Sequence, residues 1–166
     1  AVAPVMQRGA SLSYKENETR TQIFGTNEDY METISTNISK GRFFTKSEDK
    51  SGMRVTVIGD GIKKAFFGDQ NAIGEYIKID NMKFKIIGVL EEQAKFLGLF
   101  SADKQAILPF GAYKRIFSKR GFMRLSVKVP EDKILKVAIS QKTGEIWVEI
   151  PKPQKKPNDT AYEWYI

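Results

Sequence analysis

The sequence predicts an α+β fold, a mixed sheet of short strands with short helices between them. The chain has 166 residues, of which 41% are hydrophobic, enough for one domain with a packed core or for two small lobes sharing an interface. Apolar and polar residues alternate over several short segments, as in half-buried strands, and short amphipathic segments separate them. No apolar run approaches the roughly 20 residues that a helix needs to cross a bilayer.

The first elements are a strand pair and a helix. Residues 10–16 and 19–26 each alternate apolar and polar side chains, and the polar residues between them favour a hairpin or two successive strands. Residues 27–35 predict a short helix with Asn27 as its N-cap and two acidic residues in its first turn.

The middle of the chain predicts a buried strand and an amphipathic helix. The β-branched run at residues 54–59 is typical of a strand covered on both faces. Residues 60–68 follow as a helix capped by Asp60 and ended by Gly68. Its expected inward-facing residues are Ile62, Ala65, Phe66 and Phe67.

Two more strands follow, at residues 75–80 and 83–92, around a turn at Asn81–Met82 that lacks the favourable Asn-Gly pair. The next predicted elements are a strand at residues 105–110, a helix at 111–118 and a strand at 122–129.

The C-terminal part has a different character. Residues 130–139 begin like a helix, with Pro130 followed by two acids, whereas residues 144–151 alternate like a strand. The Pro- and Lys-rich residues that follow predict an extended arm. We therefore expect a core domain over residues 1–150 and an arm over 151–166.

The composition excludes much chemistry. The chain has no Cys and no His, so it lacks the usual zinc ligands and the Ser-His and Cys-His nucleophile pairs. The adjacent acids Glu48–Asp49 and Glu91–Glu92 would not converge on one substrate, because neighbours on a strand point to opposite faces. We expect no catalytic residue, no metal site and no cofactor.

The net charge of +7 would indicate nucleic-acid binding only if basic residues converged on one face. Most of them alternate with acids. The segment at residues 113–124 does interleave basic and aromatic side chains, as a single-strand binder might. The simpler interpretation is a helix whose Lys114 and Arg115, followed by Lys119 and Arg120, meet solvent while Tyr113, Ile116 and Phe117 face inward. We expect no nucleic-acid partner.

A Gly-Asp-Gly turn after the buried strand resembles the start of a nucleotide-binding fingerprint. Gly59 and Gly61 fit the pattern G-x-G-x-x-G, but Lys64 occupies the third glycine position, and no Gly-Lys-Ser/Thr sequence follows. We therefore interpret Gly59 as the end of a strand and expect no ATP binding.

Ordered short motifs resemble one known family over about residues 20 to 130. They read Gly-Arg-x-Phe, an apolar strand ending in Gly, Phe-Gly, Ile-Gly before a strand, and a strand ending Ile-Ile-Gly-Val. This order resembles the MacB-like periplasmic core domain, the extracytoplasmic segment between the first two transmembrane helices of MacB/FtsX-type ABC transporter permeases. Matching positions are Gly41, Arg42, Phe44, Val57, Ile58, Gly59, Phe67, Gly68, Ile73, Gly74, Ile77, Phe84, Ile87, Gly88, Val89, Leu108, Pro109 and Tyr113. From Glu131 onward the chain departs from the family, which has a helix leading toward the second membrane span.

The resemblance implies a porter-like and a Sabre-like subdomain, and a mechanical, non-catalytic function. The domain would couple the cycle of an ATPase in a separate domain or subunit to substrate export or partner engagement. Its implied partners are a second permease copy, the ATPase, and an adaptor or outer-membrane protein. The parent would be a bacterial inner-membrane protein, with this segment facing the periplasm or cell exterior. A stand-alone extracytoplasmic ligand- or peptide-binding module is the alternative.

Arg42 is expected to fix the Gly41 turn through an ion pair or a carbonyl contact, with a ligand-binding role as the alternative. If Arg42 is a buried charge partner, its replacement by Ala would lower the free energy of unfolding by a few kcal/mol. Gly41, Gly59, Gly68, Gly74 and Gly88 are interpreted as turn and close-packing positions, and Phe43, Phe44, Phe66 and Phe67 as core.

The candidate partner surface lies in the apolar segment at residues 95–103. Phe96, Leu97, Leu99 and Phe100 crowd apolar side chains after two glutamates, and exposed clusters of that type mark interfaces. The alternative is a small satellite core.

Overall fold

The computed structural model describes residues 1–34, 36–92, 103–117, 123–128, 136–139 and 146–149. It forms two compact units, residues 1–128 and 129–166. The second unit is described only by the antiparallel hairpin of β9 (Lys136–Ile139) and β10 (Ile146–Glu149). Residues 136–139 are therefore a strand and not the end of a helix as predicted, because their backbone pairs with β10. The arm predicted at residues 151–166 lies outside the described residues and stays a prediction.

The first unit begins with a long hairpin, β1 (Val2–Tyr14) and β2 (Asn17–Thr26), which starts earlier than the sequence pattern predicted. The register runs without interruption from Val5 opposite Thr26 to Tyr14 opposite Asn17. A one-turn helix, α1 (Tyr30–Thr33), follows. Its N-cap is Asp29, with no side-chain capping bond, so the prediction of an Asn27 cap is wrong. Asn27 instead forms a turn through its carbonyl, which accepts the Tyr30 N–H at 3.3 Å.

The next elements are β3 (Ile38–Gly41), α2 (Lys46–Ser51), β4 (Val55–Ile58) and α3 (Asp60–Phe67). Helix α3 ends at Gly68 as predicted, but its N-cap is Gly59. Asp60 is the first helical residue and pairs with Lys64 one turn later, at 2.7 Å. Ile62, Phe66 and Phe67 are buried, whereas Ala65 is exposed, because it lies beside Lys64 on the outer face.

Strands β5 (Tyr76–Ile79) and β6 (Met82–Leu90) are joined by a tight turn. The turn residues are Asp80 and Asn81, with φ of 44° and 69°, one residue earlier than predicted. Positive φ at both central positions belongs to the type I′ turn, whose twist matches that of the strands. The Asp80 carboxylate holds this conformation by accepting the Ser11 backbone N–H at 2.9 Å and pairing with Arg8 at 3.0 Å.

The last elements of the unit are β7 (Gln105–Pro109), α4 (Phe110–Phe117) and β8 (Met123–Val127). Helix α4 buries Tyr113 and Phe117 and exposes Lys114 and Arg115, as predicted.

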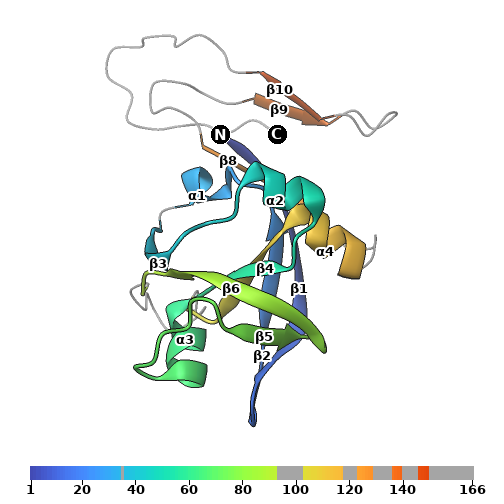
Figure 1. The fold of residues 1–166 in the computed structure, drawn as a ribbon. Coiled ribbons are helices and arrows are strands. Elements are labelled where there is room, and N and C mark those ends of the chain that lie inside the picture. Colours follow the sequence, from blue (N-terminus) through green and yellow to red (C-terminus); the bar gives the residue numbers. More distant parts are fainter. Residues whose placement is uncertain (35, 93–102, 118–122, 129–135, 140–145, 150–166) are drawn as a thin grey trace. The chain divides into compact units, whose positions relative to one another are not determined.

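The strand pairings close on themselves (Figure 1). The order β2-β7-β4-β6-β5-β1 returns to β2 through the β1–β2 hairpin, so six strands form a ring. Strand β8 adds to β1 and β3 adds to β6. The β2–β7 and β4–β6 pairs are parallel and the others antiparallel, which confirms the predicted mixed sheet.

Two hydrophobic clusters share the central strands. Strand β4 is buried along its whole length, with Ile58 in the larger cluster and Val55 and Val57 in the smaller one. Strand β7 divides in the same way, with Leu108 in the larger cluster and Ile107 in the smaller. Burial on both faces explains why these strands read as continuous apolar runs.

The chain enters and leaves this unit at one place. Strand β8 runs antiparallel to β1, with Val127 opposite Val2, and the Lys128 N–H donates to the Ala1 carbonyl at 3.0 Å.

Candidate functional site

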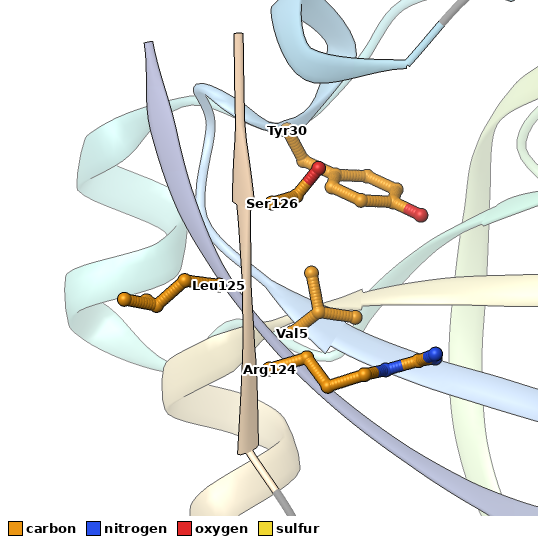
Figure 2. A pocket seen from close by; sticks show the side chains of 5 residues that line it. All are labelled: Val5, Tyr30, Arg124, Leu125 and Ser126. Atoms are coloured by element: carbon orange, nitrogen blue, oxygen red, sulfur yellow. The ribbon is translucent and has the colours of Figure 1, made fainter. Parts of the chain in front are cut away.

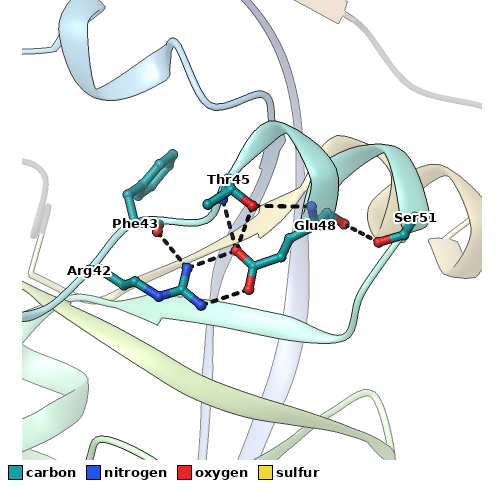
Figure 3. Close-up of polar contacts among 5 residues, drawn as sticks. All are labelled: Arg42, Phe43, Thr45, Glu48 and Ser51. Atoms are coloured by element: carbon teal, nitrogen blue, oxygen red, sulfur yellow. Dashed lines mark hydrogen bonds and ion pairs between the residues drawn. The ribbon is translucent and has the colours of Figure 1, made fainter.

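Arg42 is the best-connected polar residue of the sequence motifs (Figure 3). Its guanidinium makes two hydrogen bonds to the Glu48 carboxylate, at 2.7 and 2.8 Å, and one to the Phe43 carbonyl at 3.0 Å. Arg42 therefore makes both of the contacts considered from sequence. Its side chain is 54% exposed, so solvent screens the ion pair. The loss of a few kcal/mol of stability predicted for removing Arg42 as a buried charge partner is therefore too large.

Glu48 joins this contact to helix α2 as the N3 residue of a capping box (Figure 3). Its carboxylate accepts the Thr45 backbone N–H at 2.8 Å, and the Thr45 hydroxyl accepts the Glu48 N–H at 3.3 Å. The hydrogen bonds from Arg42 lower the pKa of Glu48 from 4.5 to about 2, despite partial burial that opposes the shift. The Glu48 carboxylate is thus ionised, and its oxygens are occupied by hydrogen bonds from Arg42 and Thr45. It is therefore a poor general acid or base at neutral pH.

The neighbouring acid, Asp49, points to a different partner. Its carboxylate accepts the Gly111 backbone N–H at 2.8 Å, which ties α2 to α4. Burial raises the pKa of Asp49 and the bond from Gly111 opposes the rise. Of the other acid pair, Glu91 accepts from the Asn37 amide at 3.1 Å and Glu92 pairs with Lys64 at 2.9 Å. Neither pair offers two converging carboxylates.

Two of the motif glycines lie where strands and turns approach closely. Gly41 has φ of 75°, and a Cβ there would collide with the carbonyl oxygen of Ile87. A Cβ at Gly88 would collide with the carbonyl oxygen of Arg42, so the β3–β6 crossing has room for backbone only. Gly68 and Gly74 have positive φ in the turns after α3 and before β5.

The space beside the Gly-Asp-Gly turn is occupied by backbone atoms of Asp103. A Cβ at Gly59 would collide with the Asp103 carbonyl oxygen, and one at Gly61 would lie 3.0 Å from the same atom. The Gly59 N–H already donates to the Gln105 carbonyl at 2.8 Å. The glycines therefore admit the backbone of Asp103, in the turn before β7, at the place where a fingerprint would admit a pyrophosphate.

The sequence did not indicate a hollow beside α1 (Figure 2). It has a volume of about 270 Å³ and is lined by Val5, Tyr30, Arg124, Leu125 and Ser126. Burial raises the pKa of Tyr30, which remains a neutral hydrogen-bonding group. The Ser126 hydroxyl donates to the Thr33 hydroxyl at 2.7 Å. The hollow offers one cation and two hydroxyls, which suits binding of a polar group, and its five lining residues include no nucleophile–base pair.

Other predicted sites are only partly described. Phe96, Leu97, Leu99 and Phe100 lie outside the described residues, as do Lys119 and Arg120. Phe44 is buried and Phe43 is half-buried, and their rings stack at 4.0 Å between centroids. Within the described ranges, no three acidic side chains gather as a metal site would require, and no helix is long and apolar enough to span a membrane.

Comparison with known proteins gives a consistent assignment. The MacB-like periplasmic core domain family matches residues 1–146. The chain is 32% identical over 120 residues to the pyoverdine export ATP-binding/permease protein PvdT of Pseudomonas aeruginosa, covering 72% of this chain and 18% of that protein. It is 34% identical over 117 residues to the ABC transporter permease YknZ of Bacillus subtilis, described as uncharacterized, covering 70% of this chain and 29% of that protein.

Solved structures show the same fold. The extracellular domain of the ABC-type transporter YknZ from Gram-positive bacteria matches with a TM-score of 0.66 at 22% identity, over 79% of this chain and 66% of that one. The periplasmic region of MacB from Actinobacillus actinomycetemcomitans matches with a TM-score of 0.68 at 16% identity, over 90% of this chain and 71% of that one. The chain spans less than a third of the length of the full-length relatives, 18% and 29%. It belongs to the MacB-like periplasmic core domain family of ABC transporter permeases.

Proposed function

We propose that this chain is a non-catalytic extracytoplasmic domain that couples the cycle of an ATPase, in a separate domain or subunit, to substrate export or partner engagement. The observation that carries the proposal is the adjacency of the two ends of the first unit. Ala1 and Lys128 exchange backbone contacts, so chain segments attached there act on one point of the domain.

A displacement applied at that point would move the unit as a body. Strand β1 receives it directly, and β1 belongs to the closed ring of six strands. The ring surrounds packed, fully buried side chains such as Phe84 and Ile58, and cores of this density transmit displacement instead of absorbing it. Such a domain needs no chemistry of its own.

The relatives support the proposed context. PvdT carries the description ATP-binding/permease protein, which names both activities in a longer chain than this one. We infer a parent in the bacterial inner membrane, with this domain facing the periplasm or cell exterior. Its partners would be a second permease copy, the ATPase, and an adaptor or outer-membrane protein.

The adjacency of the ends permits a direct experiment in the full-length transporter. Replacing residues 2–127 by a short Gly-Ser linker keeps the flanking segments close together. We expect ATP hydrolysis by the transporter to persist and substrate export to stop. Export that survives the replacement would refute the coupling role. Separately, calorimetric titration of the purified chain with ATP should show no stoichiometric binding at micromolar concentrations.

The apolar segment that contains Phe96, Leu97, Leu99 and Phe100 stays the candidate contact with a partner. Leu97→Glu combined with Leu99→Glu should leave thermal unfolding of the purified chain nearly unchanged and reduce export by the intact transporter. A large fall in unfolding temperature would place the leucines in the core. Unchanged folding and export together would remove this segment from the mechanism.

A stand-alone ligand- or peptide-binding module is the second candidate, and the hollow lined by Arg124 and Tyr30 favours it. The linker replacement separates the two candidates, since a module that binds its ligand independently of transport would leave export unchanged when it is removed.

A further inference from the structure

The outer surface of β1, β5 and β6 carries an unusual concentration of lysines. The strand register places Ser13 opposite Lys78, and Lys78 opposite Lys83, in one row across the three strands. The next row places Tyr76 opposite Lys85. We call this surface the lysine face; it consists of Ser13, Tyr14, Lys15, Tyr76, Lys78, Lys83 and Lys85. All of these except Lys85 line one shallow hollow of about 170 Å³.

These lysines do not serve the fold. Like charges directly opposite each other on antiparallel strands are destabilising, and Lys78 and Lys83 form such a pair. Across the part of the chain that the structure describes, the ion pairs use other cations, among them Arg8, Arg42 and Lys64. The four ammonium groups of Lys15, Lys78, Lys83 and Lys85 thus have no carboxylate partner among the described residues.

The acids nearest the lysine face have other roles or lie apart. Glu18 lies opposite Ser13 on β2, in the same row as Lys78 and Lys83, and its carboxylate accepts the Ser11 hydroxyl. Glu75 is exposed and accepts the Tyr14 hydroxyl at 3.2 Å. Asp80 pairs with Arg8. Glu16 is exposed in the β1–β2 turn, where Lys15 lies over the Tyr14 ring at 5.1 Å. The surface therefore keeps an excess of positive charge beside exposed aromatic and hydroxyl groups, including Tyr76, which is 56% exposed.

The lysine face lies at the far end of β1 from the chain's entry and exit, as Figure 1 shows for β5 and β8. The strand has 13 residues, and at about 3.3 Å per residue the two ends are separated by up to about 40 Å. Surface charges act over a screening length of about 8 Å. If the first unit joins the membrane through its two ends, Ala1 and Lys128, as the proposed function requires, the lysine face is too distant to bind that membrane.

We infer that the lysine face is a docking surface for an acidic, extended segment of a partner protein. Carboxylates accept hydrogen bonds from ammonium and hydroxyl groups, and the hollow brings both together. Lys83 and Lys85 lie two residues apart on β6, about 7 Å, the spacing of alternate side chains on an extended peptide.

The small extent of the lysine face favours a protein over a long polyanion. It covers two rows along the strands and three strands across, about 7 Å by 10 Å, and the Arg8–Asp80 pair and Glu75 border it. A polymer of phosphates would follow a longer basic track. Exposed tyrosines beside the charges are typical of protein interfaces.

The test is a binding titration of the purified chain, followed by fluorescence anisotropy at low salt. The probe is a labelled peptide in which Glu alternates with Ser, and the reference peptide carries Gln in place of Glu. The variant Lys78→Glu/Lys83→Glu is compared with Lys40→Glu/Lys50→Glu, which makes the same charge change at exposed lysines of β3 and α2. We expect the first variant to bind at least about tenfold more weakly and the second to stay within about twofold of the original chain.

Several results would overturn the inference. Equal weakening in both variants would mean that only net charge matters, and equal binding of the Gln peptide would exclude recognition of carboxylates. Tighter binding of polyphosphate, or of phosphatidylglycerol vesicles, with loss in the Lys78→Glu/Lys83→Glu variant would assign the surface to a polyanion or a membrane. If that variant unfolds, Lys78→Ser/Lys83→Ser takes its place. Failure here, with export still lost on linker replacement, would reject the lysine face and leave the proposed function intact.

Discussion

Replacing Glu48 by Gln should weaken the first unit in a pH-dependent way. Gln retains an acceptor for the Thr45 N–H, as capping boxes allow, but it cannot form the ion pair with Arg42. The substitution therefore isolates the contribution of charge from that of the cap. Glu48→Ala removes both, and Arg42→Ala removes the cation while leaving the capping box.

The magnitude follows from the pKa of Glu48, lowered from 4.5 to about 2. At about 1.4 kcal/mol per pKa unit, a shift of this size has an upper limit near 3.5 kcal/mol. Arg42 is 54% exposed, so solvent screening reduces that limit, and exposed pairs contribute about 0.2–1 kcal/mol. We expect Glu48→Gln and Arg42→Ala each to lower the free energy of unfolding by about 1 kcal/mol at neutral pH. Glu48→Ala should cost about 2 kcal/mol, because losing a cap adds about 1.

The sign of the pH dependence is fixed by the direction of the shift. The folded pKa lies below the unfolded value, so the stabilisation is complete above about pH 4.5 and disappears as the pH falls toward about 2. The difference in unfolding free energy between the original chain and Glu48→Gln should close over that range. Asp69→Asn, at an exposed carboxylate with no hydrogen bond or ion pair to the described residues, is the matched control and should show a small difference.

Urea unfolding followed by far-ultraviolet circular dichroism is the assay. Both tryptophans, Trp147 and Trp164, belong to the second unit, so tryptophan fluorescence would follow that unit. A Glu48→Gln difference that stays constant from neutral to acidic pH would refute the ion-pair argument. A cost above about 3 kcal/mol would show that solvent does not screen the pair.

Two further substitutions test the packing. Gly41→Ala should lower the unfolding free energy by about 2–4 kcal/mol, since it combines positive φ with a collision against the Ile87 carbonyl. Gly9→Ala should stay within about 1 kcal/mol, because a Cβ there would only touch the Gln22 side chain, at 3.9 Å. Equal denaturation midpoints would contradict this. Phe84→Ala should cost about 3–5 kcal/mol, because Phe84 is fully buried, against less than about 0.5 for Met53→Ala at an exposed site. A Phe84 variant as stable as the Met53 variant would show that Phe84 does not contribute to the hydrophobic core.

Local pattern in the sequence was enough for most elements and for the family. Strand β4 and helix α3 follow from a β-branched run and from apolar spacing closed by Gly68, signals that depend on a few neighbouring residues. The mixed sheet and the family resemblance are confirmed on the same basis. Where a segment fits two structures, as residues 136–139 do, local pattern gave the wrong one, because pairing with β10 decides it.

Tertiary structure decided which groups meet. The turn at Asp80 is set by contacts with Ser11 and Arg8, about seventy residues earlier, and no local signal contains them. The motif around Gly59 already argued against a phosphate loop, but no local signal showed that the Asp103 carbonyl occupies the space beside this glycine. The lysine face exists because strand register aligns Lys78 with Lys83 and Ser13, although each is ordinary in its own segment. Buried and exposed residues alternate along a strand, so burial can be predicted from the sequence. Which residues face each other across two strands depends on the register, and the register is fixed only when the closed ring of strands forms.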